Sequence, residues 1–245
     1  MLILAFDTTS PWGGAAIFQG EQCLASIRHE GPGDYSVSLF QAVEEMLNET
    51  GLSLRQIDLF ATANGPGSFT GIRVGLAAAQ GWSAAFGKPA RGIGVLDAMI
   101  EEAGACEDYA APVLDARRDQ FYAEWRPSPA LARSEAAPAE GGPQRASGCK
   151  PAAVVMGKEQ LSDYLQAQLP PGRTLACIAR REDARCRELA ALCPLVFRWH
   201  WVDGFLVPAI ARLALRAEFE SRPVSPEELS AFYIRRSEAE LHWKG

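Results

Sequence analysis

The sequence predicts a two-lobed α/β protein, and three observations carry that prediction. Short apolar stretches separated by polar or glycine-containing turns open the chain, which is typical of consecutive strands. A glycine-rich turn at residues 64–75 then lies between an apolar stretch and an alanine-rich stretch, as between a strand and a helix. Finally, 245 residues with 48% hydrophobic and 22% charged residues suffice for one large or two small cores.

Residues 1–105 are predicted to form the first lobe. Its expected elements are three strands, an amphipathic helix, a strand, the glycine-rich turn, a proline-free helix, a strand and a last helix. Ser36 is expected to cap the amphipathic helix and Gly51 to end it. The predicted ranges are strands 2–6, 12–18, 22–28 and 59–61, and helices 36–50, 72–86 and 95–104.

Residues 106–245 are predicted to form a second, smaller and partly irregular lobe. Two strands over 110–125 open it, and the proline-rich stretch 127–151 is expected to be loop-like and poorly ordered in part. Residues 197–201 are interpreted as a packing segment. The remaining predicted elements are strands 152–156 and 175–178, and helices 157–169, 182–192 and 204–220.

Composition excludes several classes of function. The formal net charge of −6 and the isoelectric point near 5.2 argue against stand-alone binding of nucleic acid, which needs a basic surface. The six cysteines form no Cys-x-x-Cys pair and the three histidines lie far apart, so we expect reduced thiols and no metal site. The apolar run at residues 2–6 is too short for a signal peptide or membrane span, and we expect a cytoplasmic protein without membrane contact.

Two polar turns are candidates for a phosphate site. At the glycine-rich turn, backbone N–H groups opening a helix can meet an anion, although such turns also simply connect elements. The first strand ends in Asp7 and is followed by hydroxyls, which is how the sugar-kinase, actin and heat-shock-ATPase superfamily holds a metal-bound phosphate. Alternatively, Asp7 and Thr8 cap a turn through backbone N–H groups. The candidate nucleotide-binding residues are Asp7, Thr8, Gly65, Gly67, Ser68 and Thr70.

Together the motifs resemble the bacterial TsaB (YeaZ) family, partner subunits in making the threonylcarbamoyladenosine modification of tRNA. The resemblance rests on residues 3–9, 65–75 and 113–122, is strong over 1–125 and is faint beyond. It implies an actin-like, ribonuclease-H-like (ASKHA) two-lobed fold, with a mixed sheet flanked by helices in each lobe. It also implies a TsaD-like catalytic paralogue and a TsaE-like ATPase as partners, tRNA contact only through the complex, and a homodimer when alone.

The resemblance further implies a docking surface on the first-lobe helices. Glycine and alanine crowd the helix after the glycine-rich turn, which lets a facing helix approach closely. That helix is either the chain's own 36–50 segment or part of a second subunit, and the resemblance favours a second subunit. On this interpretation, Gly75→Leu abolishes docking and leaves the monomer folded. The candidate interface residues are Leu39, Phe40, Val43, Met46, Leu47, Gly71, Gly75, Ala78 and Trp82.

The catalytic paralogue of the family carries two metal-holding histidines four residues apart on a helix. The matching helix here, 95–104, has no histidine and offers only Asp97 and Glu101, for which a solvated or partner-facing acidic surface is favoured over cation binding. We therefore expect no catalytic residue, no metal, and no cofactor beyond weak or interfacial ATP or ADP. The alternative is an independent ATP-dependent enzyme of the actin and sugar-kinase superfamily. A peptidase is not supported, because no general base is placed beside a serine or cysteine nucleophile.

Arginines in the second lobe leave two interpretations open. Arg117 and Arg118 lie between Asp115 and Asp119, which predicts an ion-paired turn first and a ligand site second. A further cluster predicts a solvated face, with an RNA-facing patch as the alternative. Its members are Arg180, Arg181, Arg185 and Arg187.

Overall fold

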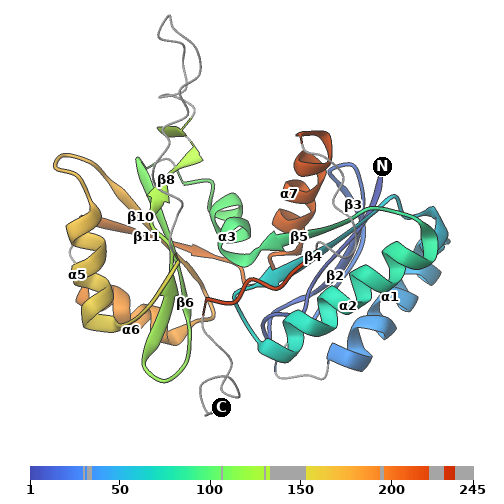
Figure 1. The fold of residues 1–245 in the computed structure, drawn as a ribbon, viewed down its shortest axis with the longest axis horizontal. Coiled ribbons are helices and arrows are strands. Elements are labelled where there is room, and N and C mark those ends of the chain that lie inside the picture. Colours follow the sequence, from blue (N-terminus) through green and yellow to red (C-terminus); the bar gives the residue numbers. More distant parts are fainter. Residues whose placement is uncertain are drawn as a thin grey trace, which may run out of the picture. The chain divides into compact units, whose positions relative to one another are not determined.

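The chain forms two compact units in a computed structural model (Figure 1). The structure describes residues 1–29, 31, 35–105, 107–129, 131–132, 153–193, 196–220 and 229–234. Met1–Glu101 and Gly204–Gly245 belong to the first unit, and Glu102–Asp203 to the second. The predicted division into 1–105 and 106–245 is therefore corrected at its C-terminal end, because the chain returns to the first unit at Gly204.

A five-stranded sheet of order β3-β2-β1-β4-β5 forms the centre of the first unit. β1, β2 and β3 are antiparallel neighbours, and β4 and β5 extend the sheet parallel to β1. Ile3 to Asp7 are all buried, so both faces of the sheet are covered at β1. The strands are β1 (Leu2–Asp7), β2 (Gly14–Gln19), β3 (Gln22–Arg28), β4 (Leu59–Gly65) and β5 (Ala90–Gly94).

Helices cover both faces of this sheet. α1 (Tyr35–Thr50) and α2 (Phe69–Phe86) lie side by side on one face, and α7 (Val207–Glu220) lies against the other (Figure 1). α3 (Val95–Ala103) follows β5, and a short 3-10 helix (Leu54–Gln56) precedes β4. Since α7 contacts β1, β2, β4 and β5, its apolar side is buried only within the first unit, which is why the chain returns there.

The second unit repeats the strand order of the first. Its sheet has the order β11-β10-β6-β7-β9, with β8 also paired to β6. β6, β7 and β9 are antiparallel neighbours, and β10 and β11 extend the sheet parallel to β6, as β4 and β5 do from β1. The strands are β6 (Tyr109–Asp115), β7 (Gln120–Ala123), β8 (Arg126–Pro127), β9 (Val154–Gly157), β10 (Leu175–Arg180) and β11 (Phe197–Val202).

Two contacting helices, α5 (Lys158–Gln168) and α6 (Ala184–Leu192), pack over this second sheet. Leu161, Leu165 and Leu189 contribute to the core beneath them. The predicted elements are confirmed within a few residues, with two exceptions. The stretch 197–201 belongs to the edge strand β11, and the predicted helix 204–220 begins only at Val207.

One expectation falls mostly on residues that the structure does not describe. Most of the proline-rich stretch 127–151 lies outside the described residues, although its first residue, Pro127, ends β8. Within the described part of the chain, no helix combines the length and apolar character needed to cross a lipid bilayer.

Candidate functional site

The glycine-rich turn packs directly onto the turn that follows β1. The Ser68 backbone N–H donates to the Thr9 carbonyl at 2.8 Å, and the Thr8 hydroxyl donates to the Gly71 carbonyl at 2.7 Å. A Cβ atom at Gly71 would lie 1.8 Å from the Thr8 carbonyl oxygen, and one at Gly67 would lie 2.6 Å from that of Thr9. These two positions therefore require glycine because two backbones approach closely there.

The Asp7 carboxylate is enclosed in this same junction. Asp7 and Thr8 are both fully buried, and Asp7 Oδ1 accepts hydrogen bonds from the Thr9 backbone N–H at 2.7 Å and the Thr9 hydroxyl at 2.6 Å. This geometry is the turn-capping alternative for Asp7. Of the other predicted nucleotide-binding residues, Gly65 is buried, whereas Gly67, Ser68 and Thr70 are exposed at the start of α2.

Tyr35, the first residue of α1, ties that helix to the turn after β1. Its hydroxyl donates to the Ser10 carbonyl, and its ring lies 4.9 Å from that of His29. The helix begins one residue before Ser36, so Ser36 is within the first turn and the prediction that it caps α1 is wrong.

α2 has one buried and one exposed stripe. Gly75 belongs to the buried stripe, where a Cβ atom would lie 2.6 Å from the Thr8 hydroxyl oxygen and 2.7 Å from that of Thr62. Gly81 belongs to the exposed stripe and has no atom within 4 Å of such a Cβ. We call the exposed side chains at four-residue spacing the outward stripe of α2: Phe69, Arg73, Ala77, Gly81 and Ala85.

Six predicted interface residues are buried within the first unit, although one of them, Ala78, also lines the groove between α1 and α2. They are Leu39, Val43, Met46, Gly71, Gly75 and Ala78. The expectation that Gly75→Leu leaves the monomer folded is also wrong, because the new side chain would displace Thr8 and Thr62 in the core. Phe40 is 47% exposed, and Leu47 and Trp82 are half-buried, so these three remain at the surface.

A shallow apolar groove of about 350 Å³ runs between α1 and α2. Trp82 lines it and contacts Phe40, with 5.7 Å between ring centroids. The Trp82 ring also contacts the core rings of Phe6 and Phe60, so it is held from beneath. The groove is lined by Ser36, Phe40, Val74, Ala77, Ala78, Gly81 and Trp82. Val74 and Ala77, which were not predicted from the sequence, lie four residues before Ala78 and Gly81, so four-residue helical spacing could have found them.

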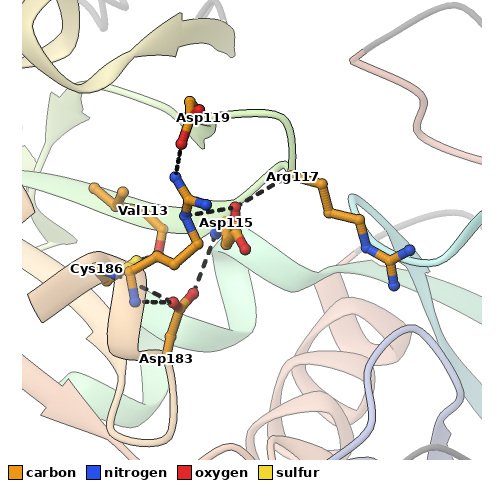
Figure 2. Close-up of polar contacts among 7 residues, drawn as sticks. Val113, Asp115, Arg117, Asp119, Asp183 and Cys186 are labelled. Carbon is orange, nitrogen blue, oxygen red and sulfur yellow. Dashed lines mark hydrogen bonds and ion pairs between the residues drawn. The ribbon is translucent and has the colours of Figure 1, made fainter. Parts of the chain in front are cut away.

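A polar cluster occupies the matching position in the second unit (Figure 2). Asp183 caps α6: its Oδ1 accepts the backbone N–H groups of Arg185 and Cys186 at 3.1 and 3.2 Å. Its other oxygen accepts the backbone N–H of Asp115, the last residue of β6, at 3.2 Å. One buried carboxylate therefore joins the start of a helix to the end of the central strand.

Arg185 holds the turn between β6 and β7. Its guanidinium pairs with Asp119 and lies 3.8 Å from Asp115 Oδ1, and the hydrogen bond to Arg185 lowers the pKa of Asp119 below its ordinary value. Arg117, Arg118 and Asp119 all have positive φ angles, of 61°, 52° and 57°. This left-handed conformation costs a non-glycine residue about 1–2 kcal/mol of conformational energy. The ion pairs of Arg185 therefore stabilise a strained turn. The turn is ion-paired, but the cation is Arg185 of α6 and not Arg117, whose side chain points away from the cluster (Figure 2).

The acidic pair on α3 does not form a cation site. Glu101 forms ion pairs with Arg212, at 3.1 Å, and with Arg216, both on α7. Burial raises the pKa of Glu101, but the hydrogen bonds from Arg216 and Arg212 outweigh it and hold the pKa below its ordinary value. Across the described ranges, no three histidine, cysteine, aspartate or glutamate side chains gather as metal ligands would.

Two units with the same strand order, each a mixed sheet flanked by helices, define an actin-like two-lobed α/β protein. Solved structures agree at the level of the fold. A YeaZ structure from Pseudomonas aeruginosa matches with a TM-score of 0.68 and 18% identity, covering 95% of this chain and 99% of its own. A second Pseudomonas aeruginosa structure, described as similar to peptidase YeaZ, matches with a TM-score of 0.69 and 19% identity over 96% and 99%.

Sequence comparisons confirm the predicted relationship to the TsaB (YeaZ) family. The tRNA threonylcarbamoyladenosine biosynthesis protein TsaB of Haemophilus influenzae is 33% identical over 126 residues, or 50% of this chain and 52% of the relative. The TsaB of Bacillus subtilis is 28% identical over 122 residues, or 50% and 53%. The family model for TsaD, a tRNA N6-adenosine threonylcarbamoyltransferase, matches residues 33–126. The chain thus spans about half the length of the curated relatives it matches.

Proposed function

We propose that this chain is a non-catalytic subunit of a tRNA adenosine-37 threonylcarbamoyl-transfer complex. It docks a TsaD-like catalytic paralogue through the surface formed by α1 and the outward stripe of α2, and so holds that subunit in an active arrangement. The TsaB relatives of Bacillus subtilis, Haemophilus influenzae and Escherichia coli are named for threonylcarbamoyladenosine biosynthesis, which supports this pathway.

The groove between α1 and α2 is the observation that carries the proposal. Phe40 offers an exposed aromatic side chain on one wall, and Ala77 and Gly81 leave the opposite wall low. Small residues in that position let a second helix approach toward the close end of the usual interhelical range, about 8 Å. Exposed aromatic residues beside such a low surface are typical anchors of protein interfaces.

Several observations favour a non-catalytic role. The three histidines of the sequence, His29, His200 and His242, all lie outside the stretch 33–126 that matches the TsaD model. Burial raises the pKa of the Cys186 thiol above its ordinary value, which keeps it protonated and unsuited to act as a nucleophile. An independent ATP-dependent enzyme would need Asp7 to reach a metal-bound phosphate, but Asp7 is fully buried. The burial of Asp7 therefore favours the non-catalytic role over the kinase-like alternative.

The proposal extends to the other partners of the complex. A TsaE-like ATPase and tRNA would be reached through the paralogue, because this chain is acidic overall. In the absence of the paralogue, the same apolar groove would pair two copies of the chain. ATP or ADP would bind weakly or at the subunit junction.

Gly81→Leu tests the docking surface. Its side chain would stand on the outward stripe without meeting another atom of the unit, so the fold should be retained and the approach of a partner helix blocked. Titration calorimetry against the host's TsaD-like paralogue, with and without ATP, should show affinity reduced at least about tenfold, or 1.4 kcal/mol.

Two variants control this test. Gly81→Ala keeps the groove low and should bind nearly as tightly as the unmodified chain. Ala184→Leu adds the same side chain at an exposed position on α6 in the second unit and should leave affinity unchanged. Full affinity in Gly81→Leu would contradict docking through this surface.

A further inference from the structure

A short C-terminal segment, residues 229–234, crosses the first unit beside the glycine-rich turn (red in Figure 1). The Phe232 backbone N–H donates to the Asn64 carbonyl at 2.8 Å, and the Asn64 side-chain amide donates to the Ser230 carbonyl at 3.3 Å. Gln80, on α2, donates to the Leu229 carbonyl at 3.2 Å. We call residues 229–234 the strap, because this segment is hydrogen-bonded to both β4 and α2, the two elements that flank the glycine-rich turn.

Leu229 anchors the strap in the core. Its side chain is only 7% exposed and belongs to the same hydrophobic cluster as Leu76 of α2 and Leu4 of β1. The strap also explains one glycine of the turn. A Cβ atom at Gly65 would lie 2.6 Å from the Phe232 carbonyl oxygen, and Gly65 has a φ angle of +114°, which side chains rarely adopt.

The strap also reaches the exposed end of α2. The rings of Tyr233 and Phe69 lie 5.3 Å apart at an angle of 33°, and the Arg73 guanidinium carbon lies 3.5 Å from the centre of the Phe69 ring. Phe69 is 37% exposed and would otherwise be free to change rotamer in solvent. Contacts with Tyr233 and Arg73 therefore hold an exposed side chain in one orientation.

We propose that the strap is an intrachain device that fixes the exposed N-terminal end of α2 and thereby controls the docking surface. Phe69 and Arg73 are the first two members of the outward stripe, so their arrangement depends on a segment more than 150 residues away in sequence. When the strap is bound, a partner meets an ordered surface. When it is released, docking must first reorder that end of the helix, which lowers the apparent affinity. The effect of the strap on docking, unlike its effect on α2, rests on the proposed function.

Leu229→Asp tests the device in the full chain, because a charge at this buried position should expel the strap. Hydrogen exchange followed residue by residue should then show loss of protection at the Phe232 amide and at the Ser68 and Gly71 amides. The amides of β1 should keep their protection if only the strap is released. Unchanged protection at Ser68 and Gly71, with Phe232 exchanging freely, would overturn the proposal.

If Leu229→Asp unfolds the first unit, a milder variant tests whether the strap contacts α2 as proposed. Tyr233→Ala removes the ring contact with Phe69 and should accelerate exchange of the Phe232 amide about three- to tenfold, the range expected for an aromatic pair. Phe232→Ala is its matched control, since Phe232 is 42% exposed against 43% for Tyr233 and contributes its backbone to the strap contacts. Equal exchange in the two variants would overturn the role of the Tyr233–Phe69 contact.

Affinity for the TsaD-like paralogue tests the link to docking. Leu229→Asp should bind about tenfold more weakly than the unmodified chain, and Phe232→Ala should not. Unchanged affinity with a released strap would overturn the link. If the unmodified chain does not bind the paralogue, the proposed function fails, while the exchange measurements still decide whether the strap holds α2.

Discussion

In the first unit the start of α2 meets the turn after β1 through close backbone contact and the Thr8 hydroxyl, whereas in the second unit the start of α6 meets the end of β6 through charged side chains. Ser68 and Asp183 are the corresponding helix caps. Three residues beyond each cap, Gly71 touches the Thr8 carbonyl, while Cys186 donates its thiol to the Val113 carbonyl at 3.7 Å. Because the two units share their strand order, the same strand end and the same helix start meet in each of them, but the residues at the meeting point differ.

The consequence of this difference is a division of roles. Close backbone contact in the first unit fixes the start of α2 against the turn after β1, where the Asp7 carboxylate is fully buried. The second unit joins these elements through the Asp183 carboxylate and holds a strained turn with ion pairs from Arg185. The two junctions share one feature: each central strand ends in an aspartate, Asp7 or Asp115, whose Oδ1 accepts the backbone N–H two residues further on, at 2.7 and 2.8 Å.

The largest expected effect comes from Gly71→Ala. The added methyl group would lie 1.8 Å from a backbone oxygen that cannot easily move, so we expect a loss of about 3 kcal/mol in the free energy of unfolding. Urea denaturation measures it. The control, Gly81→Ala on the open side of the same helix, should be neutral or stabilising by up to about 1 kcal/mol. Similar effects at both positions would contradict the close backbone packing of the first junction.

Asp183→Ala should have the next largest effect. It removes the cap of α6 and leaves the Asp115 backbone N–H without this acceptor, so we expect destabilisation of about 2 kcal/mol. In the first unit, Ser68→Ala removes only an exposed cap and should lose about 1 kcal/mol. Thermal denaturation of both variants compares the two junctions directly. Equal losses of stability would contradict a larger contribution of the Asp183 side chain than of the Ser68 side chain.

Glu101→Gln should have the smallest effect, about 1 kcal/mol at pH 7, because the ion pairs with Arg212 and Arg216 are partly exposed. These ion pairs lie where the two units stop being equivalent. α7 follows β11 in the chain as α3 follows β5, yet α7 packs on the sheet of the first unit. The pKa of Glu101 is lowered by folding, so its contribution is present above the unfolded pKa and is lost as pH falls through the folded pKa.

Melting temperatures from pH 7 to pH 3 test this sign. The difference between Glu101→Gln and the unmodified chain should shrink as pH falls below about 4.3, the ordinary value for glutamate. Glu44→Gln, at an exposed position on α1, should show no difference at any pH. A gap that widens in acid would contradict the role of the α3–α7 ion pairs.

Much of the architecture could be predicted from the sequence because it depends on local pattern. Apolar periodicity located the strands and helices of the first unit, and the motifs at residues 3–9, 65–75 and 113–122 indicated the actin-like fold and the TsaB family. The failures share one cause. Leu39, Met46 and Gly75 were assigned to the docking surface from the family resemblance and from the apolar or small side chains of the two helices, and neither says which side of a helix faces the sheet.

The sequence by itself determined the order of elements, the small-residue character of α2 and the absence of histidine from residues 33–126, because each is a property of neighbouring residues. Only the tertiary structure decided the rest. The return of the chain to the first unit, the pairing of Arg185 with Asp119 and the strap beside Gly65 join residues 66 to 168 positions apart. Such contacts depend on how buried surfaces fit together in three dimensions, which local spacing along the chain does not specify.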